Sequence, residues 1–259
     1  MSGNTKPAAG EPSVEFTLQA GGEMAMQQEL FDLATTLMPR YGDGWNSHSL
    51  LTIRRQSLSR FLHYDLLYRQ MLPVPGVICE FGVQWGATLS QLISLRGIHE
   101  PYNHSRRIIG FDTFQGFVGV DEKDGGRWAA GDYSTEDGYE TTLDRVLTLQ
   151  EGFNPLSHIK KFELVKGDAS KTTAEWLERN PHAIISMAIL DMDVYRATRD
   201  VLELIKPRLT KGSVLVFDEL SSGDFPGETL AVAEVLGLNN LSLRRSNFHT
   251  YGAWAVWGE

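Results

Sequence analysis

The chain has 259 residues, of which 42% are hydrophobic and 22% charged, a composition typical of globular proteins. Its 33 acidic side chains outnumber the 24 basic ones, and the formal net charge is −9. Because proteins bind nucleic acids largely through Lys and Arg contacts to phosphates, this excess of acid argues against a nucleic-acid partner. No run is apolar and long enough to span a membrane, and the first residues lack the order of a signal peptide, so we expect a cytoplasmic protein without a membrane partner.

The first part of the sequence predicts a tail and two helices. Residues 1–22 are rich in Gly, Pro, Ala and Ser, which predicts a flexible tail. Apolar residues at helical spacing predict a helix over 23–38, ended by Pro39, and a second helix over about 50–71, which Pro73 breaks. We therefore predict a helical prelude over 23–75 that acts as a lid, followed by a core over 76–259.

The core shows short apolar runs separated by segments of helical length. Five such runs lie at 77–81, 107–111, 162–165, 184–190 and 213–217. Continuous apolar runs of this length are typical of parallel strands buried on both faces, so the sequence predicts a doubly wound, mostly parallel, Rossmann-like α/β sheet. Two further runs, 241–244 and 253–257, predict an antiparallel hairpin at one edge. A long insert, 118–154, follows the second strand.

The first predicted strand ends in a glycine-containing turn. Glu80 is followed by Gly82 and Gly86 in a Gly-x-x-x-Gly pattern that leads into a helix. Glycine lets a ligand approach the backbone, and such sheets bind ligands at the carboxyl ends of their strands. The pattern is not the Gly-x-Gly-x-x-Gly fingerprint, which disfavours a nicotinamide-dependent oxidoreductase, and it lacks the Lys-Ser/Thr of a phosphate loop. A tight turn with close helix packing is the alternative interpretation.

Carboxylates also follow the second and third predicted strands. Asp112 ends the second strand and Asp168 follows the third. Either residue alone could cap a helix or stabilise a turn. Together with the glycine turn they form a row of strand ends suited to a ligand that has hydroxyls to bind and no phosphates to neutralise. This combination points to S-adenosylmethionine rather than a nucleoside triphosphate.

The fourth and fifth predicted strands end in acidic residues. Asp191 follows the fourth strand, and Asp218 and Glu219 follow the fifth. Adjacent strands would bring these carboxylates together, where they repel one another unless a cation joins them. Oxygen ligands suit Mg²⁺ or a similar divalent ion, so we predict a metal site. Helix caps, or ion pairs with Arg196 and Arg199, are the alternatives.

Four motifs at the predicted strand ends follow one another along the chain. They are Pro-Gly-Val-Ile-Cys-Glu-Phe-Gly-Val (75–83), Gly-Phe-Asp-Thr-Phe-Gln-Gly-Phe (110–117), Asp-Met-Asp-Val-Tyr (191–195) and Asp-Glu (218–219). From residue 75 onward the chain resembles the macrocin O-methyltransferase (TylF-type) family, which methylates sugar hydroxyls in antibiotic biosynthesis with S-adenosylmethionine and Mg²⁺. The resemblance implies an O-methyltransferase that acts on a sugar, such as nucleotide-linked rhamnose. Two departures are Gln84-Trp85-Gly86-Ala87, where the family usually has Trp-Arg-Gly-Gly, and Asp218-Glu219-Leu220, where Asp-Asp-Tyr is common.

The resemblance also implies roles for individual residues. It assigns the cofactor site to Glu80, Phe81, Gly82, Gly86, Asp112, Thr113, Phe114, Asp168 and Ala169. Within that set, Glu80 and the two glycines would shape the methionine pocket, Asp112 and Thr113 would meet the ribose, and Asp168 with Ala169 would meet the adenine. It assigns the metal to Asp191, Asp218 and Glu219.

A sugar hydroxyl needs a base, and the sequence offers two candidates. We favour Asp191, and His249 is its rival because a neutral imidazole can accept a proton near pH 7. A structural position in the hairpin turn is the alternative interpretation of His249. Two further functions stay open: a catechol-type O-methyltransferase for aromatic diols, and a non-catalytic S-adenosylmethionine-binding protein. We expect the prelude and the insert to cover the cleft, and the protein to form a homo-oligomer.

Overall fold

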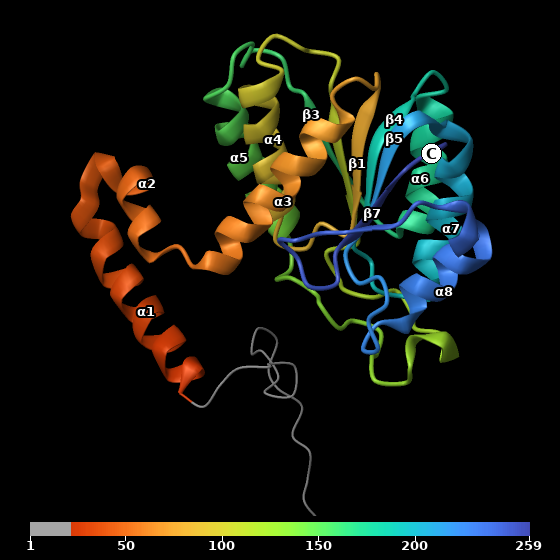
Figure 1. Cartoon of the computed structure of the whole chain (residues 1–259). Helices are drawn as coiled ribbons and strands as arrows, with labels where there is room; N and C mark the ends of the chain where they lie inside the picture. Colours follow the sequence, from red (N-terminus) through yellow and green to blue (C-terminus); the bar gives the residue numbers. More distant parts are fainter. Residues whose placement is uncertain (1–21) are drawn as a thin grey trace, which may run out of the picture. The chain divides into compact units, whose positions relative to one another are not determined.

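The computed structural model describes residues 22–259 (Figure 1). The predicted tail lies outside these residues, apart from Gly22. The chain divides into two units, Met1–Arg60 and Phe61–Glu259. Within the described residues, no helix is long and apolar enough to cross a membrane.

The first unit is helical. It contains α1 (Glu23–Leu37), the 3-10 helices η2 (Met38–Gly44) and η3 (Ser49–Thr52), and the short α2 (Trp45–His48). The first predicted helix is confirmed as α1. The second is divided into η3 and α3 (Arg55–Met71), because Ile53 takes an extended conformation between them.

The second unit is built on a single sheet. Its strands, among residues 61–259, are β1 (Val77–Phe81), β2 (Ile108–Asp112), β3 (Phe162–Lys166), β4 (Ile185–Leu190), β5 (Leu209–Phe217), β6 (Arg244–Arg245) and β7 (Ala253–Val256). The strand order is β3-β2-β1-β4-β5-β7-β6. Strands β1 to β5 are parallel, and β7 pairs antiparallel with β5 and with β6. The predicted doubly wound sheet and its edge hairpin are confirmed.

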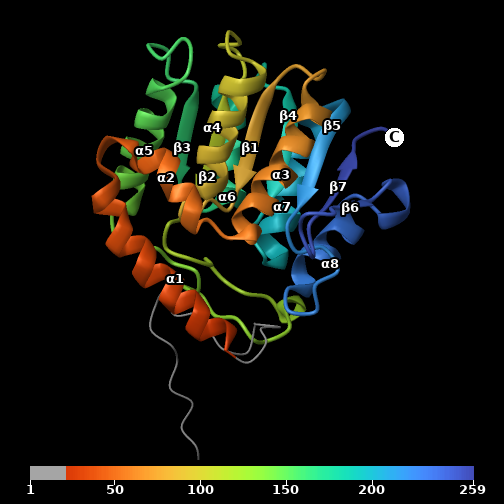
Figure 2. The same cartoon turned by 60° about the vertical axis from the view of Figure 1, so that its left-hand side comes forward.

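Helices cover both faces of the sheet. They are the second half of α3, α4 (Ala87–His99) and α5 (Tyr139–Gly152) on one face, and α6 (Ala169–Arg179), α7 (Tyr195–Ile205) and α8 (Pro226–Val235) on the other (Figures 1 and 2). Successive strand side chains point to opposite faces, so Ile78 joins the core under α3 and α4, and Cys79 joins the core under α6 and α7. Burial raises the pKa of the Cys79 thiol. Cys79 is therefore a core residue.

The boundary between the units lies earlier than the predicted boundary at residue 75. The second half of α3 belongs to the sheet unit because its apolar face enters the core through Tyr64, Leu67, Tyr68 and Met71, which are fully buried. The expected role of the preceding helices as a lid stays a prediction.

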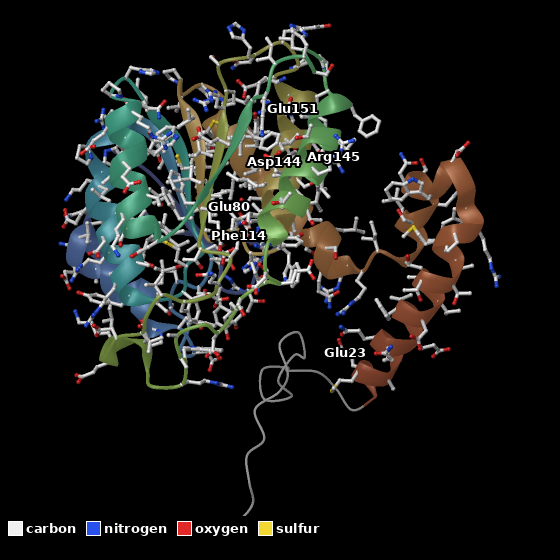
Figure 3. The ribbon with its side chains drawn as sticks, turned by 180° about the vertical axis from the view of Figure 1, so that it is seen from behind. Glu23, Glu80, Phe114, Asp144, Arg145 and Glu151 are labelled. Carbon is white, nitrogen blue, oxygen red and sulfur yellow. The ribbon has the colours of Figure 1, made fainter. Side chains whose placement is uncertain are left out.

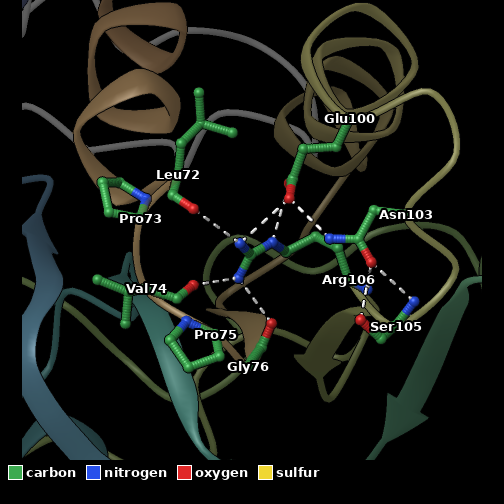
Figure 4. A pocket seen from close by; sticks show the side chains of 9 residues that line it. All are labelled: Leu72, Pro73, Val74, Pro75, Gly76, Glu100, Asn103, Ser105 and Arg106. Carbon is green, nitrogen blue, oxygen red and sulfur yellow. Dashed lines mark hydrogen bonds and ion pairs between the residues drawn. The ribbon is translucent and has the colours of Figure 1, made fainter.

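A buried arginine joins the chain segments at the amino ends of the strands. Arg106 is 3% exposed and lines a pocket of about 280 Å³ (Figure 4). Its Nη1 donates to the carbonyls of Val74 and Gly76, both at 2.8 Å, and to Ser186 Oγ at 2.9 Å. Its Nε donates to Glu100 Oε2 at 2.9 Å. Since these partners take up the guanidinium donors, this pocket is a structural junction at the end of the sheet opposite the candidate site.

Candidate active site

The strand order reverses between β1 and β4: β2 and β3 lie on one side of β1, and β4 and β5 lie on the other. Helices leave these two strands on opposite faces, and open sheets of this kind bind ligands in the crevice outside the carboxyl ends of such a strand pair. The strands meet closely there: Asp191 N donates to the Phe81 carbonyl at 2.8 Å. Gly82 has φ +94°, and a Cβ at this position would lie 1.8 Å from the Asp191 carbonyl oxygen. Only glycine permits this approach, so Gly82 fixes the geometry where Asp191 leaves β4.

The turn between β1 and α4 is held by the carboxylate of Asp112. Asp112 Oδ2 accepts from Val83 N at 2.6 Å and from Gln84 N at 2.7 Å, while its Oδ1 accepts from Phe114 N at 2.5 Å. Gly86 then begins α4 with φ +76°. The carboxylate at the end of β2 therefore shapes the predicted methionine turn, and its contact with a ribose stays a prediction.

Four predicted cofactor residues occupy buried or turn positions beside this loop. Glu80 is 1% exposed on β1, and Phe114 is 4% exposed after β2 (Figure 3). Phe81 packs against Phe111 in the core, with ring centroids 4.9 Å apart. Thr113 Oγ1 donates to the Gly116 carbonyl at 2.7 Å and so closes a turn. Their expected contacts with the cofactor stay predictions.

Asp168 caps α6, which is one of the alternatives that the sequence left open. Its Oδ1 accepts from Ser170 N at 3.0 Å and from Ser170 Oγ at 2.7 Å. Burial opposes ionisation of this carboxyl, but the hydrogen bonds from Ser170 prevail and lower its pKa. Ala169 is the first helical residue and is buried in the core. The adenine contact of both residues stays a prediction.

The ends of β4 and β5 bring acidic residues together. Leu190 pairs with Phe217, so Asp191 and Asp218 follow neighbouring positions, and Asp218 N donates to the Leu190 carbonyl at 3.2 Å. Asp193 adopts φ +63°, which is uncommon for a residue other than glycine. Burial, followed by the charges of Glu219 and Asp218, raises the pKa of Asp193 to about 8. We call Asp191, Asp193, Asp218 and Glu219 the acidic edge.

The predicted metal ligands form part of this acidic edge. Asp191, Asp218 and Glu219 supply the oxygen atoms that Mg²⁺ prefers. Over residues 22–259, however, no three His, Cys, Asp or Glu side chains form a group that could hold a metal ion. The arrangement of these carboxylates therefore does not fit a ready-made metal site, and the divalent metal stays a prediction.

His249 lies beside the acidic edge because of the hairpin. Ala253 pairs with Phe217, so the turn before β7 lies at the end of β5. His249 Nε2 is 3.7 Å from Asp218 Oδ1, and His249 Nδ1 accepts from Gly252 N at 2.9 Å. A ring nitrogen that accepts this bond carries no proton, so the neutral ring holds its proton on Nε2, toward Asp218.

Comparison with known proteins identifies the family. A family profile described as a methyltransferase domain matches residues 79–220. The chain belongs to the methyltransferase family. No curated protein matches it, but solved structures do.

Two solved structures of CalS11 resemble this methyltransferase over nearly its whole length. One, described as a calicheamicin methyltransferase, is 38% identical with a TM-score of 0.90, and the match covers 98% of this chain and all of the other. The second is the apo form of CalS11, described as a TDP-rhamnose 3'-O-methyltransferase in calicheamicin biosynthesis. It is 37% identical with a TM-score of 0.83, over 95% of this chain and 98% of the other. The O-methyltransferase NovP, 17% identical with a TM-score of 0.55 over 76% of this chain and 79% of its own, shares the fold. The resemblance to sugar O-methyltransferases is thus confirmed.

Glu228 of this methyltransferase also contacts the acidic edge, although no sequence motif pointed to it. Glu228 is fully buried in α8, and its Oε1 accepts from Glu219 N at 3.2 Å. Its Oε2 is buried without a hydrogen-bond partner among the described residues. Burial, followed by the charges of Asp193 and Asp218, raises the pKa of Glu228 well above its usual range. An acid in the first turn of a helix is common, so its sequence position gave no signal.

Glu228 should make the stability of this methyltransferase fall as pH rises. A carboxyl whose folded pKa is raised has no effect below its unfolded pKa, near 4.5, and destabilises the fold increasingly from there up to its folded pKa. We expect the stability advantage of Glu228→Gln over wild type to grow as pH rises above the unfolded pKa, by at most about 1.4 kcal/mol per pH unit. Urea unfolding with a chelator present measures the difference.

Glu234→Gln is the matched control for this experiment. Hydrogen bonds from Tyr195 and Lys123 lower the pKa of the exposed Glu234, so its stabilisation exists above the unfolded pKa and is lost toward low pH. Its pH trend should have the opposite sign. A pH-independent difference between Glu228→Gln and wild type would contradict the assignment of Glu228.

Proposed function

We propose that this methyltransferase uses S-adenosylmethionine to methylate a hydroxyl of a nucleotide-linked deoxysugar, such as TDP-rhamnose, in antibiotic or related natural-product biosynthesis. The observation that carries the proposal is the near full-length similarity to CalS11, at 37–38% identity. The acidic edge beside the β1–β4 crevice supports it, because carboxylates bind and deprotonate hydroxyls.

The crevice fits S-adenosylmethionine, which supplies a methyl group bonded to a positively charged sulfur. Gly82 and Gly86 let the β1–α4 turn pack closely against the Asp191 carbonyl and the Leu143 side chain, where a Cβ would clash. Glu80 supplies a buried carboxylate behind the turn. Asp112 holds the turn in place through Val83 N and Gln84 N. These residues would bind and orient the cofactor.

The acceptor hydroxyl must lose its proton as its oxygen bonds to the methyl carbon and the bond from that carbon to sulfur breaks. We assign proton acceptance to Asp191, which follows β4 directly at the crevice. The bond from Gly252 N to His249 Nδ1 supports this choice, since it leaves His249 Nε2 as a donor. Alignment of oxygen, carbon and sulfur in the crevice can lower the barrier by ~7–11 kcal/mol.

The carboxylates of the acidic edge are not arranged as a metal site among the described residues, so the roles above are assigned to side chains of the protein alone. Metal dependence is therefore an arm of the test. Homo-oligomer formation likewise stays a prediction, which light scattering after size exclusion can test.

The deciding experiment measures methyl transfer from labelled S-adenosylmethionine to dTDP-rhamnose. We expect transfer with normal saturation by both substrates. Chelator-treated protein with and without added Mg²⁺ tests the metal. Transfer to catechols but not to dTDP-rhamnose would replace the proposal with the aromatic-diol function. Calorimetric binding of S-adenosylmethionine without transfer to any diol would replace it with a non-catalytic function.

Variants of His249 distinguish its role as a hydrogen-bond donor from a role as the general base. Gln can place an N–H near the position of Nε2, but it cannot accept a proton at neutral pH. If His249 acts on Asp218 through the N–H at Nε2, which lies 3.7 Å from Oδ1, we expect His249→Ala to lower kcat about threefold to tenfold and His249→Gln to restore most of the rate. Initial-rate kinetics from pH 5.5 to 9 measure both. Equal losses of about 10²-fold or more in both variants, with loss of the acidic limb of the pH profile, would make His249 the base.

A further inference from the structure

The first part of the insert reaches across the carboxyl ends of the sheet. We call residues 117–133 the strap. It begins after β2, yet Asp124 Oδ1 accepts from Tyr195 N, after β4, at 2.7 Å. Arg127 Nη1 is 3.0 Å from Asp224 Oδ1, after β5. In the sheet, β1 and β4 lie between β2 and β5. The strap therefore passes the carboxyl ends of β1 and β4, and it is the yellow-green segment below the sheet in Figure 2.

The strap carries aromatic side chains that pack together. Trp128 stacks on Phe225 with ring centroids 4.6 Å apart, and its Nε1 donates to the Asp224 carbonyl at 2.9 Å. The Tyr133 ring lies 5.4 Å from that of Phe117 and 5.5 Å from that of Trp128. We call Phe117, Trp128, Tyr133 and Phe225 the aromatic wall. Tyr133 is 45% exposed, so the wall keeps an accessible side.

The aromatic wall lies next to the acidic edge. Phe225 belongs to the loop that begins with Asp218 and Glu219. Burial, followed by the charges of Asp193 and Glu219, raises the pKa of Tyr133 to about 12. The exposed ring of Tyr133 in the aromatic wall therefore lies near carboxylates of the acidic edge. A sugar matches this combination, because its ring carries an apolar C–H face and its rim carries hydroxyls.

We propose that the aromatic wall binds the acceptor, with Tyr133 packed against the apolar face of the sugar ring while the acidic edge holds the sugar hydroxyls. This inference rests on the proposed function and names the surface that selects its substrate. The charges that act on Tyr133 are mainly acidic, Asp193, Glu219 and Asp132 against Arg127, so a diphosphate is less suited to this position than an uncharged sugar. The nucleotide part of the substrate therefore lies away from Tyr133.

Kinetics and binding of Tyr133 variants test the inference. We expect Tyr133→Ala to raise the KM for dTDP-rhamnose about tenfold, the scale of an aromatic contact, with kcat within about threefold of wild type. Tyr133→Phe should keep the wild-type KM, because the ring and not the hydroxyl makes the contact. The Kd values of S-adenosylmethionine and of dTDP alone should not change. Tyr102→Ala, at a position 77% exposed in the turn after α4, is the control.

The other outcomes are also informative. An unchanged KM in a folded Tyr133→Ala protein overturns the inference, and so does an equal loss of dTDP affinity, which would place the nucleotide on the wall. If wild type binds dTDP-rhamnose without methylating it, and Tyr133→Ala weakens that binding, the proposed function fails and the inference stands. If wild type does not bind dTDP-rhamnose, both fail. Tyr133→Leu, which keeps apolar bulk, replaces the Ala variant if the latter unfolds, with the same expected rise in KM.

Discussion

Asp191→Asn is expected to reduce methyl transfer by about 10²–10⁴-fold, the range attributed to general base catalysis. Asn keeps the size of the side chain and the backbone bond from residue 191 to Phe81, but its amide cannot accept the proton of the acceptor hydroxyl. The loss should be in kcat, because cofactor binding uses the β1–α4 turn. Single-turnover rates with labelled S-adenosylmethionine, together with calorimetric Kd values, measure the two effects separately.

The control for this variant is Asp200→Asn. Asp200 lies on α7 in a half-exposed pair with Arg199, at 2.5 Å, and removal of its charge should leave the rate unchanged. A loss of cofactor affinity in Asp191→Asn as large as the loss of rate would contradict the role of Asp191 as base. Full activity in Asp191→Asn would also remove that role.

Glu151→Gln is expected to cost about 3–5 kcal/mol of unfolding free energy, because it leaves two buried cations without their anion. Glu151 on α5 contacts Arg96 Nη2 from α4, and its Oε1 lies 2.7 Å from Lys161 Nζ. All three side chains are at most 3% exposed. Arg96 Nη1 also donates to the Lys161 carbonyl at 2.8 Å, so the network joins α4, α5 and the start of β3. Urea unfolding at pH 7 measures the loss.

Asp144→Asn on the same helix is the matched control. Figure 3 labels both Glu151 and Asp144 on α5. Asp144 pairs with Lys160 at 2.6 Å, but both side chains are about half exposed, and such pairs contribute roughly 0–1 kcal/mol. A loss of unfolding free energy in Glu151→Gln as small as that in Asp144→Asn would contradict the prediction that the buried network holds α5 against α4.

The position of this network predicts that Glu151→Gln changes stability and not catalysis. Arg96 and Lys161 lie at the amino ends of β2 and β3, whereas the candidate site lies at the carboxyl ends. We therefore expect a Glu151→Gln protein assayed well below its melting temperature to keep a kcat near that of wild type.

Local sequence patterns were enough to predict the sheet and most of the residues at its rim. Continuous apolar runs identify buried parallel strands, and the residue after each run must lie at the carboxyl edge, whatever the loops do. This reasoning placed Asp112, Asp191 and Asp218 at the rim, and the structure has each of them after its expected strand. The turn into α4 was likewise predicted from Gly82 and Gly86.

The contacts of these residues, in contrast, follow from the three-dimensional arrangement of the chain. Asp112 holds the β1–α4 turn, Asp168 caps a helix, and Glu228 enters the acidic edge from α8. The bond from Gly252 to His249 fixes which ring nitrogen faces Asp218. The strap meets residues some 70 to 100 positions away. Contacts between residues so distant in sequence depend on strand order and loop path, which local periodicity does not encode.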